Sequence, residues 1–199
     1  MRQHGARGLQ TPGLRICSAV LLAALLVAAA CGGASKEAPA KREASSRLAT
    51  PFPLEPIVAF DLDGRDVSSA TWKGKVVIVN FWATWCGPCR REMPALAALQ
   101  DKYRDRLLVI GVLDDNVTDD FAREFGRTVK LNYPVVRSTP EIEHRFPTVL
   151  ALPMTFIIDT RTNLVAMFAG EVDAAALEAE VVRVLRGGGG LLPAAPPAG

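Results

Sequence analysis

The chain has 199 residues, of which 49% are hydrophobic, enough for one folded domain with terminal extensions. Acidic and basic residues nearly balance, with a formal net charge of +2 and no basic stripe, so nothing favours a nucleic-acid partner. Of the four cysteines, only Cys86 and Cys89 lie outside the N-terminal leader. A single close pair argues against both a framework of structural disulfides and a four-ligand zinc site.

Residues 1–31 have the pattern of a secretory signal peptide. Met1–Arg15 is basic without acidic residues, and Ile16–Ala30 is apolar but shorter than a membrane span of about 20 residues. Small residues precede Cys31 and two glycines follow it, which resembles the bacterial lipobox, where the cysteine is lipidated. We expect a lipoprotein anchored at Cys31, with simple cleavage after Ala30 and an uncleaved anchor as alternatives. All three place the domain outside the cytoplasm, facing the periplasm or the cell exterior.

The leader is followed by a segment that cannot build a core. Residues 32–51 are rich in Ala, Ser, Lys, Glu and Pro, which predicts a disordered tether. The folded domain is expected over residues 52–186. Residues 187–199 begin with a glycine run and continue with Pro and Ala, which predicts a disordered tail.

Within the domain, hydrophobic patterning predicts alternating strands and helices. Asp63-Gly64 predicts a hairpin turn between Ile57–Leu62 and Arg65–Val67. Further strands are expected at Val76–Phe81, Leu107–Leu113, Tyr133–Val136, Met154–Asp159 and Leu164–Ala169. Helices are expected at Ser68–Trp72, Gly87–Tyr103, Thr118–Phe125, Thr139–Phe146 and Asp173–Arg186, with Pro94 bending the second. This order predicts an α/β fold with a mixed central sheet flanked by helices.

The stretch Val76–Arg91 carries the chemistry. Cys86 and Cys89 stand at i and i+3, so a helix beginning here places them on one face, roughly 5–6 Å apart. That separation suits a disulfide. The helix N-terminus also stabilises a thiolate at Cys86. The local sequence therefore predicts a thiol pair that opens and closes, hence a thiol–disulfide oxidoreductase that needs no metal or cofactor.

The segments FWATWCGPCRREMP and ALPMTFIID, with the insertion between them, resemble the TlpA/ResA-like branch of the thioredoxin superfamily over about residues 52–186. The resemblance implies a thioredoxin fold with an N-terminal β-hairpin extension and a central βα insertion. It also implies that Cys86 attacks a substrate disulfide and that Cys89 resolves the mixed disulfide. Gly87 and Pro88 would support the active site, and Trp85 would form part of its rim.

Pro153 matches the cis-proline of this family. The resemblance places it against the two cysteines, which leaves the backbone of Leu152 free to pair with an extended substrate. An ordinary trans-proline at a strand entry is the alternative. Trp72 and Trp82 are expected in the core, and His144 on a helix surface.

Glu92 follows Cys89 by three residues and can lie on the thiol face of the helix. Partial burial there would raise the pKa of its carboxyl group, which could then accept the proton of Cys89. Related ResA-like proteins carry an acid at this place, and a solvated helix glutamate is the alternative. Thioredoxin itself has a buried aspartate where this chain has Asn80, so proton handling is expected to fall to Glu92.

The function that this resemblance implies is reduction of exported protein disulfides, for example those of apocytochrome c during cytochrome c maturation. A membrane electron donor of the CcdA/DsbD type would supply electrons. A copper-binding metallochaperone is an alternative, although copper proteins of this fold usually have CxxxC and a downstream histidine. A thiol peroxidase is a second alternative, although the PxxxTxxC motif that activates its cysteine is absent.

Overall fold

The computed structural model describes residues 44–147 and 149–187. The expected signal peptide, the lipidation at Cys31, most of the tether and nearly all of the C-terminal tail lie outside these residues. Among the described residues, no helix is long and apolar enough to cross a membrane.

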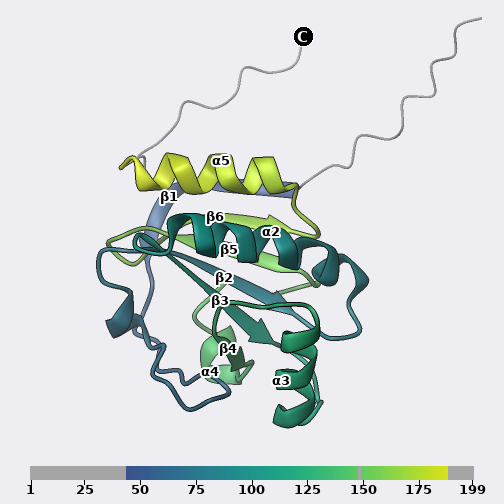
Figure 1. Ribbon diagram of the computed structural model, residues 1–199. Helices are drawn as coiled ribbons and strands as arrows, with labels where there is room; N and C mark the ends of the chain where they lie inside the picture. The colour runs from purple at the N-terminus through teal and green to yellow at the C-terminus, as the bar shows by residue number, and fades with distance from the viewer. Residues whose placement is uncertain (1–43, 148, 188–199) are drawn as a thin grey trace, which may run out of the picture. The chain divides into compact units, whose positions relative to one another are not determined.

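Six strands form one mixed sheet in the order β1-β6-β5-β2-β3-β4 (Figure 1). The strands are β1 (Ala44–Pro53), β2 (Val76–Trp82), β3 (Leu107–Leu113), β4 (Val135–Arg137), β5 (Met154–Ile158) and β6 (Asn163–Ala169). β2, β3 and β4 run parallel, whereas β5 is antiparallel to β2 and to β6, and β1 is antiparallel to β6. The predicted mixed sheet is therefore confirmed.

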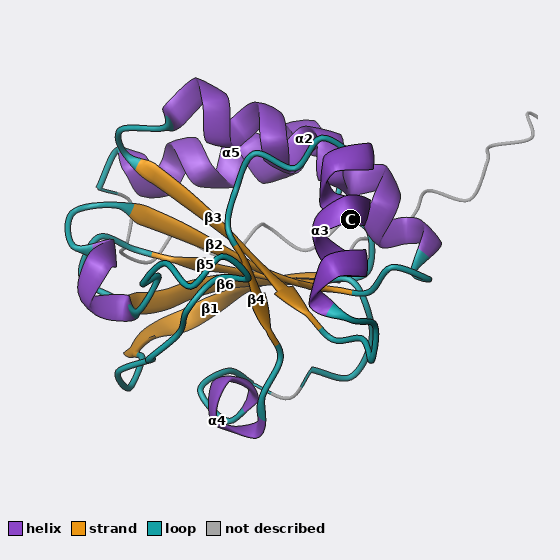
Figure 2. Cartoon of the chain, turned by 60° about the horizontal axis from the view of Figure 1, so that its bottom comes forward, coloured by secondary structure: helices purple, strands orange, loops and turns teal. Residues whose placement is uncertain are grey.

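The central strands are buried because helices and loops cover both faces of the sheet. Every residue of β2 and of β5 is buried, in keeping with their nearly unbroken apolar sequences. α2 (Gly87–Tyr103) and α5 (Ala174–Leu185) lie side by side on one face, and α4 (Pro140–Glu143) lies on the other (Figure 2). The 3-10 helix η1 (Ser69–Trp72) adds the buried Trp72 to the core on the α4 face.

Side-chain caps begin the helices where the sequence predicts them. Thr118 accepts a hydrogen bond from the backbone of Phe121 at the start of α3 (Asp119–Thr128). Thr139 caps α4 and Asp173 caps α5 in the same way. α3 is the helix of the central insertion, and its Phe125 ring stacks on Trp82, with 5.5 Å between the ring centroids. The insertion therefore packs directly against the end of β2.

Two expectations for the N-terminal part of the domain need correction. The predicted tether covers residues 32–51, but residues 44–53 form β1, because their backbone pairs with β6 along the sheet edge. The predicted turn at Asp63-Gly64 forms, with Gly64 at a φ of 79°. Its flanks are joined by a single antiparallel bridge between Phe60 and Asp66, not by two full strands.

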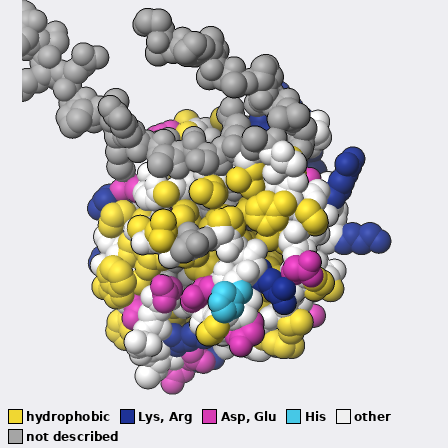
Figure 3. All heavy atoms as spheres, turned by 180° about the vertical axis from the view of Figure 1, so that it is seen from behind, with side chains coloured by type: hydrophobic (Ala, Val, Ile, Leu, Met, Phe, Trp, Pro, Cys, Tyr) yellow, Lys and Arg dark blue, Asp and Glu magenta, His cyan; other side chains and the backbone are white. Residues whose placement is uncertain are grey.

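The face of the sheet opposite α2 and α5 is less completely covered. Phe52 and Leu150 are exposed, and Leu48, Val149 and Met167 are only partly buried against the core of this face. Figure 3 shows apolar side chains gathered on the side of the molecule seen from behind, with charged side chains toward one end.

Candidate active site

The two cysteines form a disulfide at the N-terminus of α2. The Cα atoms of Cys86 and Cys89 are 5.3 Å apart. Cys86 is the N-cap of the helix, and its sulfur accepts the backbone N–H of Cys89 at 3.2 Å. The first turn of a helix has backbone N–H groups without a partner inside the helix, and Pro88 contributes none because it lacks an N–H. The Cys86 sulfur therefore pairs with one of the few N–H donors that this turn offers. In the reduced protein this donor and the helix dipole would stabilise a thiolate at Cys86.

The disulfide lies just below the surface. Cys86 is 3% exposed and Cys89 is fully buried, whereas the neighbouring Trp85 is 71% exposed. The cysteines pack with Trp82, Met93 and other apolar side chains, and Leu152 lies against the same cluster. Access to the sulfurs is therefore easier at Cys86, and the exposed Trp85 precedes it directly in the chain.

The sheet register brings Pro153 to the same end of the sheet as the cysteines. Phe81 of β2 pairs with Met154 of β5 in antiparallel order, so the residue before Met154 lies at the end of β2, level with Trp82. The Leu152–Pro153 bond is cis, as predicted. The Pro153 carbonyl accepts the N–H of Gly170, whereas the Leu152 backbone has no hydrogen-bond partner among the described residues. An extended peptide could pair with it.

Glu92 is buried on the inner face of α2, not solvated. Its side chain is only 3% exposed, and Oε1 accepts a hydrogen bond of 2.6 Å from Nδ2 of Asn80. Oε2 lies 3.3 Å from the backbone N–H of Val172. Asn80 donates a second hydrogen bond, of 3.0 Å, to Oγ1 of Thr155. Four parts of the chain therefore meet at the Glu92 side chain, one helical turn from Cys89. They are β2, α2, β5 and the loop before α5.

Asp115 is a further residue of the site, and sequence reasoning missed it. Its Oδ2 accepts both the backbone N–H of Thr84, at 3.0 Å, and the Thr84 hydroxyl, at 2.5 Å. These bonds hold the loop between β2 and the cysteines against the segment after β3. Asp115 follows the carboxyl end of a strand parallel to β2, and that position is the signal that could have identified it.

Two of the other singled-out side chains lie away from these sulfurs: Trp72 is buried in the core on the α4 face, and His144 is exposed at the end of α4. Trp82 is also buried, as predicted, and packs with the cysteines. Among the described residues there is no group of three or more His, Cys, Asp or Glu side chains that could hold a metal ion.

A mixed sheet flanked by helices, with a Cys-Gly-Pro-Cys disulfide at a helix N-terminus and a cis-proline beside it, defines a thioredoxin-fold thiol–disulfide oxidoreductase. The AhpC/TSA family model matches residues 28–167, and the chain belongs to this family.

Individual relatives and solved structures agree with this class. The chain is 35% identical over 122 residues to the thiol-disulfide oxidoreductase ResA of Bacillus thuringiensis subsp. konkukian, which covers 61% of this chain and 70% of the relative. It is 38% identical over 102 residues to the thioredoxin-like protein YneN of Bacillus subtilis, covering 50% and 59%. The crystal structure of a thiol:disulfide interchange protein from Chlorobium tepidum matches with a TM-score of 0.61 at 32% identity, covering 69% of this chain and 98% of the other.

Proposed function

We propose that this thiol–disulfide oxidoreductase works as a reductant of protein disulfides outside the cytoplasm. The observation that carries the proposal is the pairing of a sulfur at a helix N-terminus, Cys86, with a buried carboxylate, Glu92, one turn beyond the second cysteine. The helix N-terminus favours an attacking thiolate at Cys86, and Glu92 provides an acceptor for the proton of Cys89. The Gly-Pro dipeptide between the cysteines is the one found in thioredoxin, whose potential of about −270 mV is reducing.

The reaction begins with both cysteines reduced. The Cys86 thiolate attacks one sulfur of the client disulfide, and the other client sulfur leaves as a thiolate. Cys89 then gives its proton to Glu92, and its sulfur displaces the remaining client sulfur from Cys86. The client gains two electrons and its two thiolates take up protons from solvent, while the enzyme keeps a disulfide and a protonated Glu92. Return to the starting state requires a dithiol donor.

Several side chains would hold the client during this exchange. Trp85 offers an exposed aromatic surface beside Cys86. The free backbone groups of Leu152, fixed by the cis bond to Pro153, would pair with an extended segment around the client cysteine.

The leader sequence supports an extracytoplasmic location, with a lipid at Cys31 tethering the domain to a membrane. Reduction there needs electrons carried through the membrane, and a transporter of the CcdA/DsbD type is the donor we propose. Exported proteins with cysteine pairs, such as apocytochrome c, are the clients we propose. The similarity to a relative named thiol-disulfide oxidoreductase ResA supports thiol–disulfide exchange as the reaction.

The test is a turnover assay with a disulfide-bonded protein such as insulin as the client and dithiothreitol as the electron source. We expect the fragment beginning at Cys31 to catalyse reduction and Cys86→Ser to abolish it. Cys89→Ala should instead accumulate a mixed disulfide, which can be isolated from cells to identify clients and donor.

Trp72→Phe, in the core on the α4 face, is the matched control and should retain activity. Activity retained by Cys86→Ser would refute the assignment of the attacking thiol. Efficient oxidation of reduced client proteins, with negligible reduction, would refute the proposed direction.

A further inference from the structure

Two backbone N–H groups in the loop between β6 and α5 bond to two different parts of the active site. Gly170 donates to the carbonyl of Pro153 at 2.9 Å, and Val172 donates to Oε2 of Glu92 at 3.3 Å. The other carboxylate oxygen of Glu92 is held by Asn80 of the central strand β2. Loops are the most mobile parts of a fold. The orientation of Glu92 therefore depends in part on what keeps this loop in place.

Glu171, between these two residues, joins the loop to α2 by an ion pair. Its Oε2 accepts hydrogen bonds from Nε of Arg91 at 2.9 Å and from Nη2 at 2.6 Å. The Glu171 side chain is 17% exposed, whereas that of Arg91 is 60% exposed. Arg91 directly precedes Glu92 in the chain. The ion pair therefore fixes the loop to the same turn of α2 that carries the buried carboxylate.

The charges of this ion pair also lie close to the cysteines. A Cβ on Gly87, the residue after Cys86, would lie 3.7 Å from Nη1 of Arg91. A positive charge at Arg91 favours a thiolate nearby, and a negative charge at Glu171 opposes one. Loss of either charge would therefore change thiol reactivity in opposite directions. A contact that holds the loop needs both partners, so its loss would act in the same direction for both.

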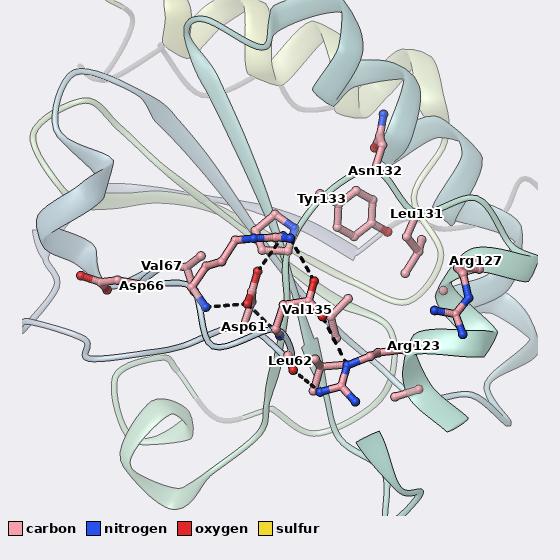
Figure 4. A pocket seen from close by; sticks show the side chains of 15 residues that line it. Asp61, Leu62, Asp66, Val67, Arg123, Arg127, Leu131, Asn132, Tyr133 and Val135 are labelled. Carbon is pink, nitrogen blue, oxygen red and sulfur yellow. Dashed lines mark hydrogen bonds and ion pairs between the residues drawn. The ribbon is translucent and has the colours of Figure 1, made fainter. Parts of the chain in front are cut away.

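Ion pairs of the same kind join other elements of the described chain. Figure 4 shows Arg123 of α3 reaching the Leu62 carbonyl beside a surface pocket, and the same side chain pairs with Asp63. Lys102 pairs with Glu178 at 2.6 Å and joins the last turn of α2 to α5. The Lys102 side chain is 60% exposed, as in the loop pair, but it lies at the far end of α2 from the cysteines.

We propose that the ion pair between Arg91 and Glu171 holds residues 170–172 against Glu92 and thereby orients its carboxyl group for the resolving step. The proposal rests on the proposed role of Glu92 as acceptor of the Cys89 proton. A general base works only when its oxygen is held within reach of the proton that it takes. Arg91 and Glu171 act through Glu92 and are positioning residues. The first step, attack by the other cysteine on the client, does not use Glu92 and does not need the loop.

The test is to neutralise each partner, by Arg91→Gln and by Glu171→Gln, and to follow both chemical steps by stopped flow. We expect each variant to slow the decay of the mixed disulfide by about two- to fivefold, a small effect because an exposed ion pair contributes little. The double variant should be no slower than the slower single variant, because both substitutions remove one contact. Arg91→Lys, which keeps an ion pair, should restore part of the rate. The Val172 amide should exchange its hydrogen faster in both single variants.

Lys102→Gln is the matched control, and its decay rate and Val172 exchange should equal those of the wild type. Opposite effects of Arg91→Gln and Glu171→Gln on the decay would overturn the proposal, because they would indicate charge acting directly on the cysteines. An unchanged decay in Glu171→Gln, with a slow decay in Glu92→Gln, would overturn it as well and leave the proposed role of Glu92 intact. An unchanged decay in Glu92→Gln would instead refute that role and, with it, the proposal.

Discussion

Asn80 and Glu92 form a fully enclosed hydrogen bond of 2.6 Å that joins the central strand β2 to helix α2 behind the redox disulfide. The amide of Asn80 donates to the carboxylate and to Thr155 through the same nitrogen. An asparagine in this place can orient Glu92 but cannot itself exchange a proton at neutral pH. The structure thus separates two tasks that one ionisable residue could combine. Asn80 orients the carboxyl group of Glu92, and Glu92 is the residue that can exchange a proton.

Replacing Glu92 by Gln should slow the resolving step about 100-fold, because the amide cannot accept the Cys89 proton. The pKa of Cys89 in the reduced protein should fall, since a nearby negative charge is removed. Stopped-flow measurement of mixed-disulfide decay and thiol titration by alkylation rate test both effects. Glu178→Gln, on the surface of α5, is the matched control. Equal decay rates in wild type and Glu92→Gln would remove Glu92 from the mechanism.

Asn80→Asp would place a second carboxylate against Glu92. Two carboxylates at this distance cannot both ionise, so the pair would hold a proton and its folded-state pKa would rise above that of the unfolded chain. A group with a raised folded-state pKa makes the protein less stable as pH rises. The melting temperature of the variant should therefore lie further below that of the wild type at pH 8 than at pH 5. Exposed Asn116→Asp should show no such trend. If the melting temperature of Asn80→Asp lay below that of the wild type by the same amount at both pH values, the result would contradict an enclosed contact between residues 80 and 92.

Gly111→Ala should destabilise the protein by about 1–3 kcal/mol, because the new methyl group would meet the Trp82 and Tyr133 rings in a closed space. Gly126→Ala in α3 is the control. There the nearest atom would be Cδ1 of Leu131, at an ordinary 3.6 Å, and alanine favours the helix by about 0.5–1 kcal/mol. In urea unfolding, the free energy of unfolding should therefore fall for Gly111→Ala and rise for Gly126→Ala, relative to the wild type. If Gly111→Ala left the free energy of unfolding unchanged, the space beside Gly111 would be larger than the structure shows.

The buried Tyr133 should make the folded protein lose stability in alkali. Its pKa is raised from the ordinary 10.0 by burial, and then by the charge of Glu92. Below pH 10 both states are protonated, and above it the unfolded chain ionises first, so stability falls as pH rises. Tyr133→Phe should reduce this loss between pH 9 and 11, measured by urea unfolding. Absorbance titration should show a late tyrosinate signal that is absent in the variant. Ionisation of Tyr133 at the ordinary pKa of a tyrosine would contradict the burial.

Local rules explain what the sequence predicted well. The helix start at Cys86 and the caps at Thr118, Thr139 and Asp173 depend on neighbouring residues only. β1 was missed because its pairing is set by β6, more than a hundred residues away, and its own sequence resembles a linker. The contact between Asn80 and Thr155 was missed for the same reason, because sheet register sets it and no local pattern encodes register.

The site is assembled from distant parts of the chain. Asn80 and Thr155 are separated by 75 positions, and Glu92 and Val172 by 80. Closing such long loops costs entropy before any contact forms, so these contacts belong to the slow, late part of folding. A chain emerging N-terminus first would expose its two cysteines before β5 and the loop preceding α5 exist. Glu92 would then lack its contact to Val172, and Asn80 would lack its contact to Thr155, until the C-terminal third has docked.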